Sequence, residues 1–317
     1  MNILITGGAG FIGSHLSERL IRLGHAVSII DDLNDYYAPE LKRRNLASIR
    51  EAGTYVFHHA DIRDAGRVLE IVQQEQPEVI VHLAARAGVR PSLEQPLLYE
   101  EVNLRGTLIL LEAARAADVR KFIFASSSSI YGIANQVPFR EDDHAVMPIS
   151  PYAATKIGGE KLCYAYSHLY NLSVVCLRFF TVYGPRQRPD LAIRKFTEMI
   201  SRGQPIPVYG DGSAGRDYTF VADTVSGIVA SIEYPCSFDV FNLGNSHPIS
   251  LLTMIGTIEE CVGAKAIMQH LPDQPGDVPI TYADISKARR LLNYAPQTPF
   301  AEGIRRFVEW YRERSSL

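Results

Sequence analysis

Short apolar runs alternate with amphipathic stretches from the beginning of the chain onward. The runs Asn2–Ile5, Ala26–Ile30 and Val79–Leu83 have the length and composition of buried strands, and so do Phe122–Ala125 and Val174–Leu177. Strands and helices in turn predict βαβ units, which form a parallel sheet with helices on both faces. We therefore expect an α/β fold with a doubly wound parallel sheet, in which ligands bind beyond the carboxyl ends of the strands.

The alternation weakens after residue 182, where connections rich in glycine and proline separate the helical stretches. Apolar residues recur at helical spacing near Ile193–Ile200, Ser286–Leu292 and Ala301–Arg314. The pattern predicts a larger domain over residues 1–182 and a smaller, mixed α/β lobe over residues 183–317, with the chain free to cross between them.

Composition excludes several classes of protein. The 317 residues are 46% hydrophobic, and the net charge of -3 lacks the basic excess that nucleic-acid binding needs. The chain opens in a strand pattern without a leader, and no window reaches the ~18 apolar residues of a membrane span. We expect a cytoplasmic protein with neither nucleic acid nor membrane as partner.

The cysteines and histidines show no spacing typical of metal or redox sites. No metal is therefore predicted. The four cysteines, Cys163, Cys176, Cys236 and Cys261, are expected to be buried thiols, and His82, inside an apolar run, is expected in the core.

The loop between the first expected strand and helix reads TGGAGFIG, with glycines at Gly7, Gly10 and Gly13. Glycines permit a tight turn and close approach of the backbone, so that a helix N-terminus can face a pyrophosphate. By itself such a loop can be only a turn. Its place before a helix, together with Asp31 and Asp32 after the second strand, favours a dinucleotide, because a carboxylate there accepts hydrogen bonds from ribose hydroxyls.

The same carboxylates repel a 2′-phosphate and therefore favour NAD over NADP. Three basic residues argue the other way, because Lys42, Arg43 and Arg44 could meet such a phosphate. They follow well after the strand end, where a basic run is more often a solvated helix face. The expected cofactor remains NAD.

A second pattern, Tyr152-Ala153-Ala154-Thr155-Lys156, begins directly after Pro151, which is a good helix start. Tyr152 and Lys156 would then lie one turn apart on one helix face. A tyrosine with its usual pKa of about 10 is a poor base, but a nearby ammonium and a positive nicotinamide ring both favour the phenolate. Tyr152 could then accept a hydroxyl proton while hydride leaves the same carbon, although this spacing is a weak signal among sixteen tyrosines.

The run Ser126–Ser129 follows the expected strand Phe122–Ala125. A serine run more often caps a helix or fills a turn. Here it ends a buried strand on the cofactor side, so a hydroxyl that positions a substrate oxygen is the better interpretation.

Six motifs, TGGAGFIG, HLAARAGVRPS, SSSSIYG, SPYAATK, RFFTVYGPRQRPD and GRDYTFVAD, follow one another along nearly the whole chain. With them the chain resembles the extended short-chain dehydrogenase/reductase family, and specifically its nucleotide-sugar epimerases and dehydratases. The resemblance implies a Rossmann-type domain with tightly held NAD and a C-terminal lobe that grips UDP or a related nucleotide. It also suggests a homodimer through the helices around Leu104–Ala117 and Tyr152–Leu169, although an apolar helix face could equally be internal.

The resemblance implies roles for individual residues. The catalytic set would be Ser127, Tyr152 and Lys156. Besides Tyr152 and Lys156, the residues expected at the cofactor are Gly7, Gly10, Phe11, Ile12, Gly13, Asp31, Asp32, Asn34, Lys42, Asp61, Ile62, Leu83, Ala84 and Ala85. Those expected at the substrate are Arg90, Ser128, Ser129, Thr181, Arg188, Arg216 and Asp277. Arg216 could instead form a surface ion pair, and Asp277 could be a turn residue.

The serine run also discriminates among reactions of the family. Sugar 4,6-dehydratases place Thr-Asp-Glu, and related decarboxylases a Glu, where this chain has Ser127-Ser128-Ser129. The acid that would eliminate or protonate beyond C4 is therefore missing, which favours epimerisation. Thr181 replaces the Asn of galactose epimerases, and the segments Phe179–Asp190 and Asp31–Tyr37 look like those of UDP-glucuronate 4-epimerases.

The expected reaction is reversible 4-epimerisation of UDP-glucuronate to UDP-galacturonate through a 4-keto sugar. The hydroxyls of Ser128, Ser129 and Thr181 are expected to hold the sugar carboxylate, and Arg188 to hold either that carboxylate or the diphosphate, unless it only ties down its own loop. The alternatives are a UDP-glucose/galactose-type 4-epimerase, a UDP-glucuronate decarboxylase, or a non-catalytic NAD-binding regulator on the same fold.

Overall fold

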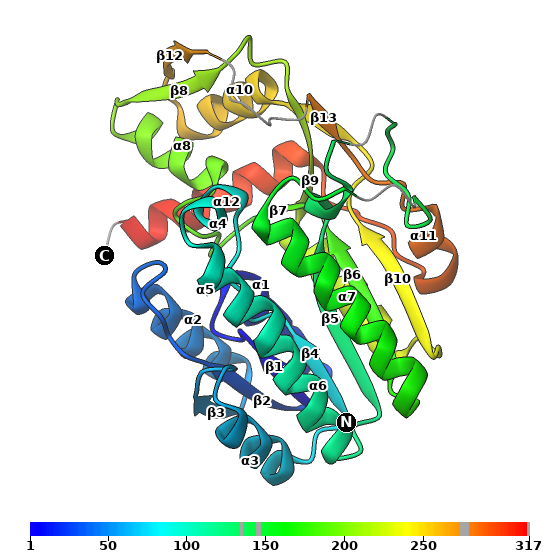
Figure 1. The fold of residues 1–317 in the computed structure, drawn as a ribbon. Coiled ribbons are helices and arrows are strands. Elements are labelled where there is room, and N and C mark those ends of the chain that lie inside the picture. Colours follow the sequence, from blue (N-terminus) through cyan, green and yellow to red (C-terminus); the bar gives the residue numbers. More distant parts are fainter. Residues whose placement is uncertain (134–135, 144–146, 273–278, 316–317) are drawn as a thin grey trace.

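The computed structural model describes residues 1–317 except 134–135, 144–146, 273–278 and 316–317. Within this part of the chain, the larger lobe is built on a seven-stranded parallel sheet in the order β10-β6-β5-β4-β1-β2-β3 (Figure 1). Its strands are β1 (Asn2–Thr6), β2 (Ala26–Asp31), β3 (Val56–His59), β4 (Val79–His82), β5 (Lys121–Ser127), β6 (Ser173–Phe179) and β10 (Phe238–Leu243). The predicted fold class is confirmed, and the five strands expected from apolar runs are all present.

Two strands of this sheet were not expected. Strand β3 lies at the sheet edge and reads VFHH, with a single buried residue, so it has no apolar run to mark it. Strand β10 comes from far beyond residue 182, yet it pairs in parallel with β6 and forms the opposite edge. Parallel pairing between such distant segments leaves no local signal in the sequence.

Both faces of the sheet are covered, because alternate residues of each strand point to opposite sides. Ile3 and Ile5 of β1 pack in one buried cluster, whereas Leu4 between them packs in another. On the first side lie α1 (Phe11–Arg22), α2 (Pro39–Ala52) and α9 (Val221–Glu233). On the other side lie α3 (Ala65–Glu75), α6 (Gly106–Ala116) and α7 (Pro151–Tyr170), of which α6 and α7 run side by side in Figure 1.

The smaller lobe contains two small sheets. The first is made of β7 (Thr181–Tyr183), β9 (Gly215–Phe220), β11 (Pro248–Ser250) and β13 (Ile280–Thr281), and the second of β8 (Pro205–Tyr209) and β12 (Ile267–Leu271). Its helices are α8 (Ala192–Ser201), α10 (Leu251–Val262) and α12 (Phe300–Ser315), whereas α11 (Ser286–Leu292) packs against β10 and α9 of the larger lobe. The three helices expected after residue 182 are therefore present as α8, α11 and α12.

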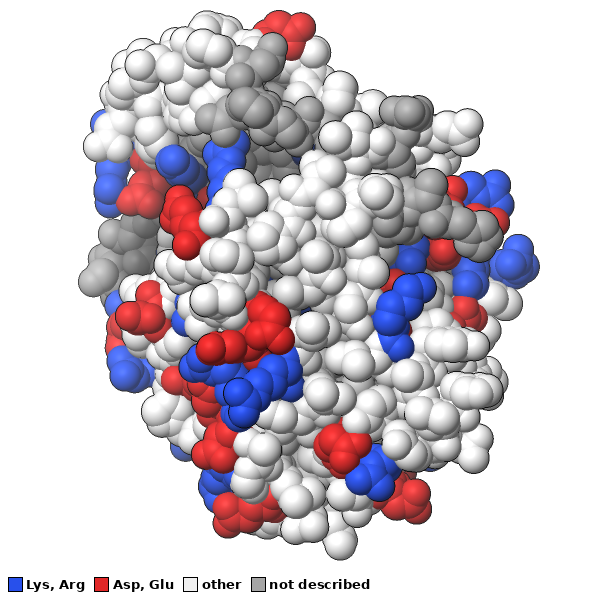
Figure 2. Space-filling model, viewed as in Figure 1, with Lys and Arg blue, Asp and Glu red and all other residues white. Residues whose placement is uncertain are grey.

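Short helical segments follow β4 and β5. They are α4 (Val89–Glu94), α5 (Pro96–Glu100), the π-helical turn η1 (Glu101–Arg105) and the 3-10 turn η2 (Ser128–Tyr131). On the face shown in Figure 2, acidic and basic side chains are interspersed. None of the described helices is both long and apolar enough to cross a membrane.

The cysteines agree only in part with the expectation of buried thiols. Cys163 and Cys176 are buried, but Cys236 and Cys261 are half-buried. His82 lies in the core as expected, with its ring nitrogens 2.7 Å from the Thr6 hydroxyl and 3.0 Å from the Thr107 hydroxyl. Burial lowers the pKa of His82 to about 3, so the ring is neutral at physiological pH.

Candidate active site

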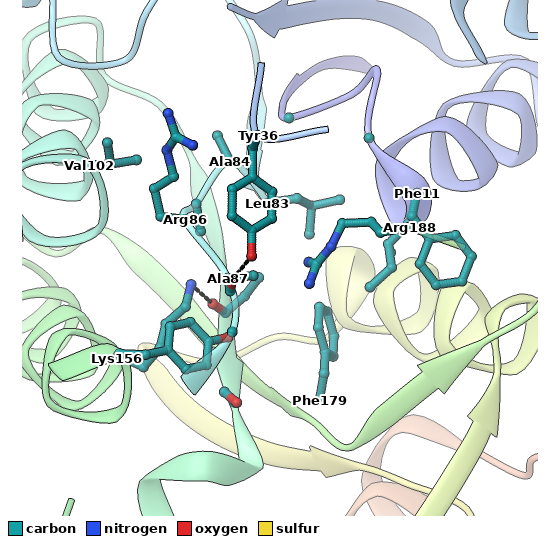
Figure 3. Close-up of a pocket in the computed structure, with 18 of the residues that line it drawn as sticks. Phe11, Tyr36, Leu83, Ala84, Arg86, Ala87, Val102, Lys156, Phe179 and Arg188 are labelled. Atoms are coloured by element: carbon teal, nitrogen blue, oxygen red, sulfur yellow. Dashed lines mark hydrogen bonds between the residues drawn. The ribbon is translucent and has the colours of Figure 1, made fainter. Parts of the chain in front are cut away.

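A cavity of about 580 Å³ opens beyond the carboxyl ends of β1, β2, β4 and β5, and residues of both lobes line it (Figure 3). Every site residue expected from the sequence and described by the structure lies in its wall. On the larger lobe these are Gly7, Gly10, Phe11, Ile12, Gly13, Asp31, Asp32, Asn34, Lys42, Asp61, Ile62, Leu83, Ala84, Ala85, Arg90, Ser127, Ser128, Ser129, Tyr152 and Lys156. Three further wall residues come from β7 and the chain after it: Thr181, Arg188 and Arg216. Asp277 lies outside the described residues.

The glycine loop is as tight as its sequence predicts. Gly7 has a positive φ of 72°, and a Cβ there would lie 2.7 Å from the backbone nitrogen of Ala84. A Cβ on Gly13 would lie 2.2 Å from the Gly7 carbonyl oxygen. Helix α1 begins at Phe11 without a side-chain cap from Gly10, so its first backbone N–H groups are available to an anion. This cradle fits the pyrophosphate of a dinucleotide.

Asp31, at the end of β2, is held by the backbone. Its carboxylate accepts hydrogen bonds from the N–H groups of Ala9 at 3.1 Å and Leu33 at 3.0 Å. Burial raises the pKa of Asp31, whereas the charge of Lys42 and the two backbone bonds oppose the rise. A fixed carboxylate at this place fits a ribose with free hydroxyls.

Lys42 does not lie on the solvated face that a basic run more often forms, but in the cavity wall, where the family resemblance placed it. Its ammonium lies 3.9 Å from Asp31 and donates a hydrogen bond of 3.0 Å to the carbonyl of Asn34, and its side chain is only 6% exposed. Arg43 and Arg44 do face solvent and pair with Glu40. Successive residues of a helix point about 100° apart, so a basic run is divided between buried and exposed faces.

The catalytic candidates meet where β5 faces α7. The helix begins at Pro151, with the Ser150 hydroxyl accepting a capping hydrogen bond of 3.2 Å from the N–H of Ala153. Lys156 donates a hydrogen bond of 2.7 Å to the carbonyl of Ala125, and its ammonium lies 6.0 Å from the centroid of the Tyr152 ring (Figure 3). The expected geometry, with both residues on one helix face, is present.

The environment shifts the titration of both side chains. Burial lowers the pKa of Lys156 to about 8. Burial raises the pKa of Tyr152, and both its hydrogen bond with Ser127 and the charge of Arg188 act in the opposite direction. Burial disfavours the Tyr152 phenolate, so the positive charges and hydrogen bonds around the side chain decide how readily the phenolate forms.

The arginines on the substrate side are partnered by nearby residues. Arg188 makes a bidentate ion pair with Asp190 at 2.9 and 2.8 Å, and Arg216 donates to the carbonyl of Gly215 at 2.9 Å. The Arg90 guanidinium lies 5.5 Å from the ring centroid of Tyr209 in β8. The hydroxyl-bearing candidates Ser128, Ser129 and Thr181 line the same cavity.

Several wall residues were not singled out from the sequence. The hydroxyl of Tyr36 donates to the carbonyl of Ala87 at 2.7 Å, and so does the hydroxyl of Tyr99, outside the described wall, at 2.9 Å. The guanidiniums of Arg86 and Arg188 lie 5.4 and 5.5 Å from the Tyr36 ring centroid, and Figure 3 shows them on either side of that ring. Their position in the sequence could have indicated them, because Tyr36 follows β2 and Arg86 follows β4, and ligand-binding loops of this fold follow the strands.

The family described as GDP-mannose 4,6 dehydratase matches residues 4–307. The chain belongs to this family. The resemblance to extended short-chain dehydrogenases/reductases that act on nucleotide sugars is thereby confirmed. Within the same family, the UDP-glucuronate 4-epimerase of Thermodesulfobacterium geofontis is 42% identical over 315 residues, which cover 99% of this chain and 97% of that protein.

Two solved structures show how similar the fold is to known members. The UDP-glucuronic acid 4-epimerase of Bacillus cereus, in complex with UDP-glucuronic acid and NAD, matches with a TM-score of 0.92 and 35% identity over 99% of this chain and 100% of that one. The UDP-glucose 4-epimerase of Thermotoga maritima, with UDP-glucose, matches with the same TM-score and 33% identity over 99% and 100%. The fold alone therefore does not separate an acidic from a neutral sugar.

Proposed function

We propose that this chain is a UDP-glucuronate 4-epimerase that interconverts UDP-glucuronate and UDP-galacturonate with bound NAD. The observation that carries the proposal is the junction of β5 and α7. There Ser127, Tyr152 and Lys156 face the cavity together, while the adjoining turn offers only the hydroxyls of Ser128 and Ser129 and no carboxylic acid. Such a site can exchange a proton and a hydride at one carbon but lacks the acid needed for elimination.

In this mechanism Tyr152 accepts the proton of the C4 hydroxyl, and Ser127 holds the same oxygen through its own hydroxyl. NAD, which the glycine loop and Asp31 would hold, would supply the hydride acceptor for C4 in both directions. Lys156 stabilises the Tyr152 phenolate by its charge and is positioned to hold the ribose next to the reactive ring. After the 4-keto sugar has turned over, Tyr152 returns the proton to the C4 oxygen, so no net oxidation occurs.

We propose that the cofactor is held by the glycine loop and by Asp31. The tight turn at Gly7 and Gly13 and the open N-terminus of α1 support a pyrophosphate contact. Asp31 favours a ribose without a 2′-phosphate, and Asp61 and Ile62 line the same cavity further along the sheet, where we place the adenine.

The sugar carboxylate must be recognised while the ring presents both of its faces to the cofactor during one cycle. We assign this task to Ser128, Ser129 and Thr181, whose short hydroxyls can accept either orientation, and to Arg188. The nucleotide remains fixed in the smaller lobe, with Arg90 and Arg216 in the wall. Asp277 is assigned to the nucleoside on its motif alone.

We further propose a cytoplasmic homodimer that associates through α6 and α7. The support is the exposed apolar surface of these helices, where Leu108, Tyr164 and Leu169 are 38%, 55% and 64% exposed. Light scattering coupled to gel filtration would measure the oligomeric state. We also propose that the chain divides into a larger and a smaller lobe near residue 182, and that β10 later returns to the larger lobe.

The experiment that tests the function is product analysis of UDP-glucuronate turnover by the purified protein without added NAD. A C4 epimer is the expected product. A UDP-pentose with released CO₂ would establish a decarboxylase, and no turnover of any UDP-sugar would favour a non-catalytic NAD-binding protein. Faster turnover of UDP-glucose than of UDP-glucuronate would establish the neutral-sugar epimerase, which the Thermotoga maritima match keeps in consideration.

A further inference from the structure

Strand β5 and helix α7 are joined by a series of contacts between consecutive strand residues and successive helical turns. The carbonyl of Ala125 accepts the hydrogen bond from Lys156, and the hydroxyl of Ser127 is hydrogen-bonded to Tyr152. Tyr152 and Lys156 are one turn apart and therefore share a helix face. Both contacts belong to the catalytic set described above.

A third contact continues this series one turn further along the helix. Between Ala125 and Ser127, the hydroxyl of Ser126 donates to the Glu160 carboxylate at 2.5 Å. Glu160 is four residues after Lys156 and lies on the same face of α7, but it is not part of the described cavity wall. The proposed mechanism gives this buried carboxylate no role in proton or hydride transfer.

The position of Glu160 is fixed from a second strand by Arg178 of β6. The guanidinium donates to one carboxylate oxygen at 3.0 Å and to the other at 2.9 Å, and the two side chains are only 7% and 8% exposed. Ser126 and Arg178 are direct partners in the sheet register. A bidentate pair of this kind permits little change in distance or angle, so it ties α7 to the ends of β5 and β6.

We propose that Glu160, held by Ser126 and Arg178, is a positioning residue that sets the distance between α7 and the end of β5 and thereby aligns Tyr152 with Ser127. The inference rests on the proposed chemistry of Tyr152 but not on the identity of the sugar. Small errors in the placement of reacting groups are costly in enzymes, which gives a remote contact of this kind its effect on turnover.

The same network has a distal arm that serves as a control. Arg178 also donates to the Tyr131 hydroxyl at 2.9 Å, which in turn donates to the Asn242 side chain at 2.7 Å. Tyr131 is buried and its ring stacks on Phe139 of the cavity wall, but its hydroxyl is bonded to Arg178 and Asn242 and to neither Ser126 nor Glu160. Its hydroxyl therefore contributes to packing and stability without touching the contact between β5 and α7.

The test compares Ser126→Ala with Tyr131→Phe, each of which deletes one buried hydroxyl. In Ser126→Ala we expect kcat to fall about tenfold with KM within about twofold of wild type, because alignment rather than binding is lost. The pH at which kcat rises in this variant should be higher than in the wild type by about half a pH unit, since a looser Ser127 contact raises the pKa of Tyr152. Tyr131→Phe should lower the melting temperature but leave kcat and the pH profile unchanged.

Glu160→Gln is a second variant, which keeps the shape of the side chain and removes the charge that Arg178 binds. We expect the same changes in kcat and pH profile as in Ser126→Ala, together with a larger loss of stability because Arg178 is left buried without its counter-ion. If this variant does not fold, Ser126→Ala, which retains the ion pair, still decides the question.

A readout without substrate separates this inference from the proposed function. The absorbance of tyrosinate is measured as a function of pH in the wild type, in Ser126→Ala and in Tyr152→Phe. The difference between the wild type and Tyr152→Phe gives the titration of Tyr152. The titratable and charged groups near Tyr152 are Lys156, Arg188, Tyr36 and Tyr99, beside the hydroxyl of Ser127. Those near Glu160 are Arg178, Lys156 and Cys176, beside the hydroxyl of Ser126. The Tyr152 titration should move to higher pH in Ser126→Ala, whichever UDP-sugar the enzyme uses.

Unchanged kcat, pH profile and Tyr152 titration in both Ser126→Ala and Glu160→Gln would overturn the inference. So would equal changes in Tyr131→Phe, because the network would then act only through general stability.

Discussion

The two sides of the cavity are built differently. On the side of β5 and α7, the ammonium of Lys156 is bonded to a distant part of the backbone, the carbonyl of Ala125. On the substrate side, Arg188 is bonded to Asp190, two residues away. We infer from this difference that the groups proposed for proton transfer are held in one geometry, whereas the groups proposed to bind the sugar can change partners.

This contrast fits the proposed reaction. The C4 carbon must meet the same base and the same hydride acceptor twice, so that side gains from rigidity. The sugar must be held in two orientations, so its recognition gains from local, exchangeable bonds. The predictions below test each side in turn.

Tyr152→Phe should have the largest effect, a fall in turnover of about 100-fold or more, because it removes the proton acceptor and keeps the ring. NAD and UDP-glucuronate should still bind, as measured by calorimetry on the purified variant. Turnover close to that of the wild type would remove Tyr152 from the mechanism.

Lys156→Met should reduce turnover by about 30-fold, because general-base catalysis weakens as the phenolate becomes harder to form. Loss of a positive charge 6.0 Å from the Tyr152 ring should raise the pKa of Tyr152, so the pH at which kcat rises should increase. The measurement is the pH–rate profile of the variant beside that of the wild type. An unaltered profile would contradict a role for Lys156 in tuning Tyr152.

The catalytic side was also the easier one to predict from sequence. Tyr152 and Lys156 lie on one helical turn, and Gly7 and Gly13 lie close together in the sequence where β1 meets α1, so local spacing was enough to find all four. The contact between Glu160 and Arg178 depends on the register of two strands and a helix, which no local pattern encodes. The seventh strand, β10, escaped prediction for the same reason.

The orientation of single side chains was harder still. Lys42 belongs to a basic run that looks exposed, and only the direction in which α2 packs turns it toward Asp31. Tyr36 lies in a segment that the sequence marked as typical of a subgroup, but its contacts with Arg86 and Arg188 join loops that follow different strands. Such contacts follow from tertiary packing rather than from residue spacing.

Asp31→Ala should weaken NAD binding by about 1.5–3 kcal/mol, the range for hydrogen bonds to a charged group, and should relax discrimination against NADP. The structure adds a reason, because Lys42 then loses its carboxylate partner and is free to meet a 2′-phosphate. Fluorescence titration of the cofactor-free protein with NAD and NADP measures both effects.

The double variant Asp31→Ala/Lys42→Ala is the matched control. It should lose NAD affinity to the same extent but should not gain NADP affinity. If the purified wild type already binds NADP more tightly than NAD, the cofactor assignment is wrong.

The smallest effects are expected on the substrate side. Thr181→Val and Arg188→Ala should each reduce the preference for UDP-glucuronate over UDP-glucose by about 1–2 kcal/mol in kcat/KM, as one polar contact to the carboxylate is lost. The effect of Arg188→Ala is moderated because the wild-type side chain must leave Asp190 before it can bind the sugar. Some UDP-pentose is also expected, since a 4-keto uronate whose carboxylate is no longer held near the ring plane loses CO₂ more readily.

Asp190→Asn decides between the two roles of Arg188. If Arg188 binds the carboxylate, removal of its competing partner should leave the preference for UDP-glucuronate intact or increase it, whereas Arg188→Ala decreases it. If Arg188 only ties down its loop through the ion pair, the two variants break the same contact and should behave alike. Suppose that Asp190→Asn and Arg188→Ala lose the preference for UDP-glucuronate to the same extent, while Thr181→Val keeps that of the wild type. The uronate would then be recognised elsewhere than on this side of the cavity.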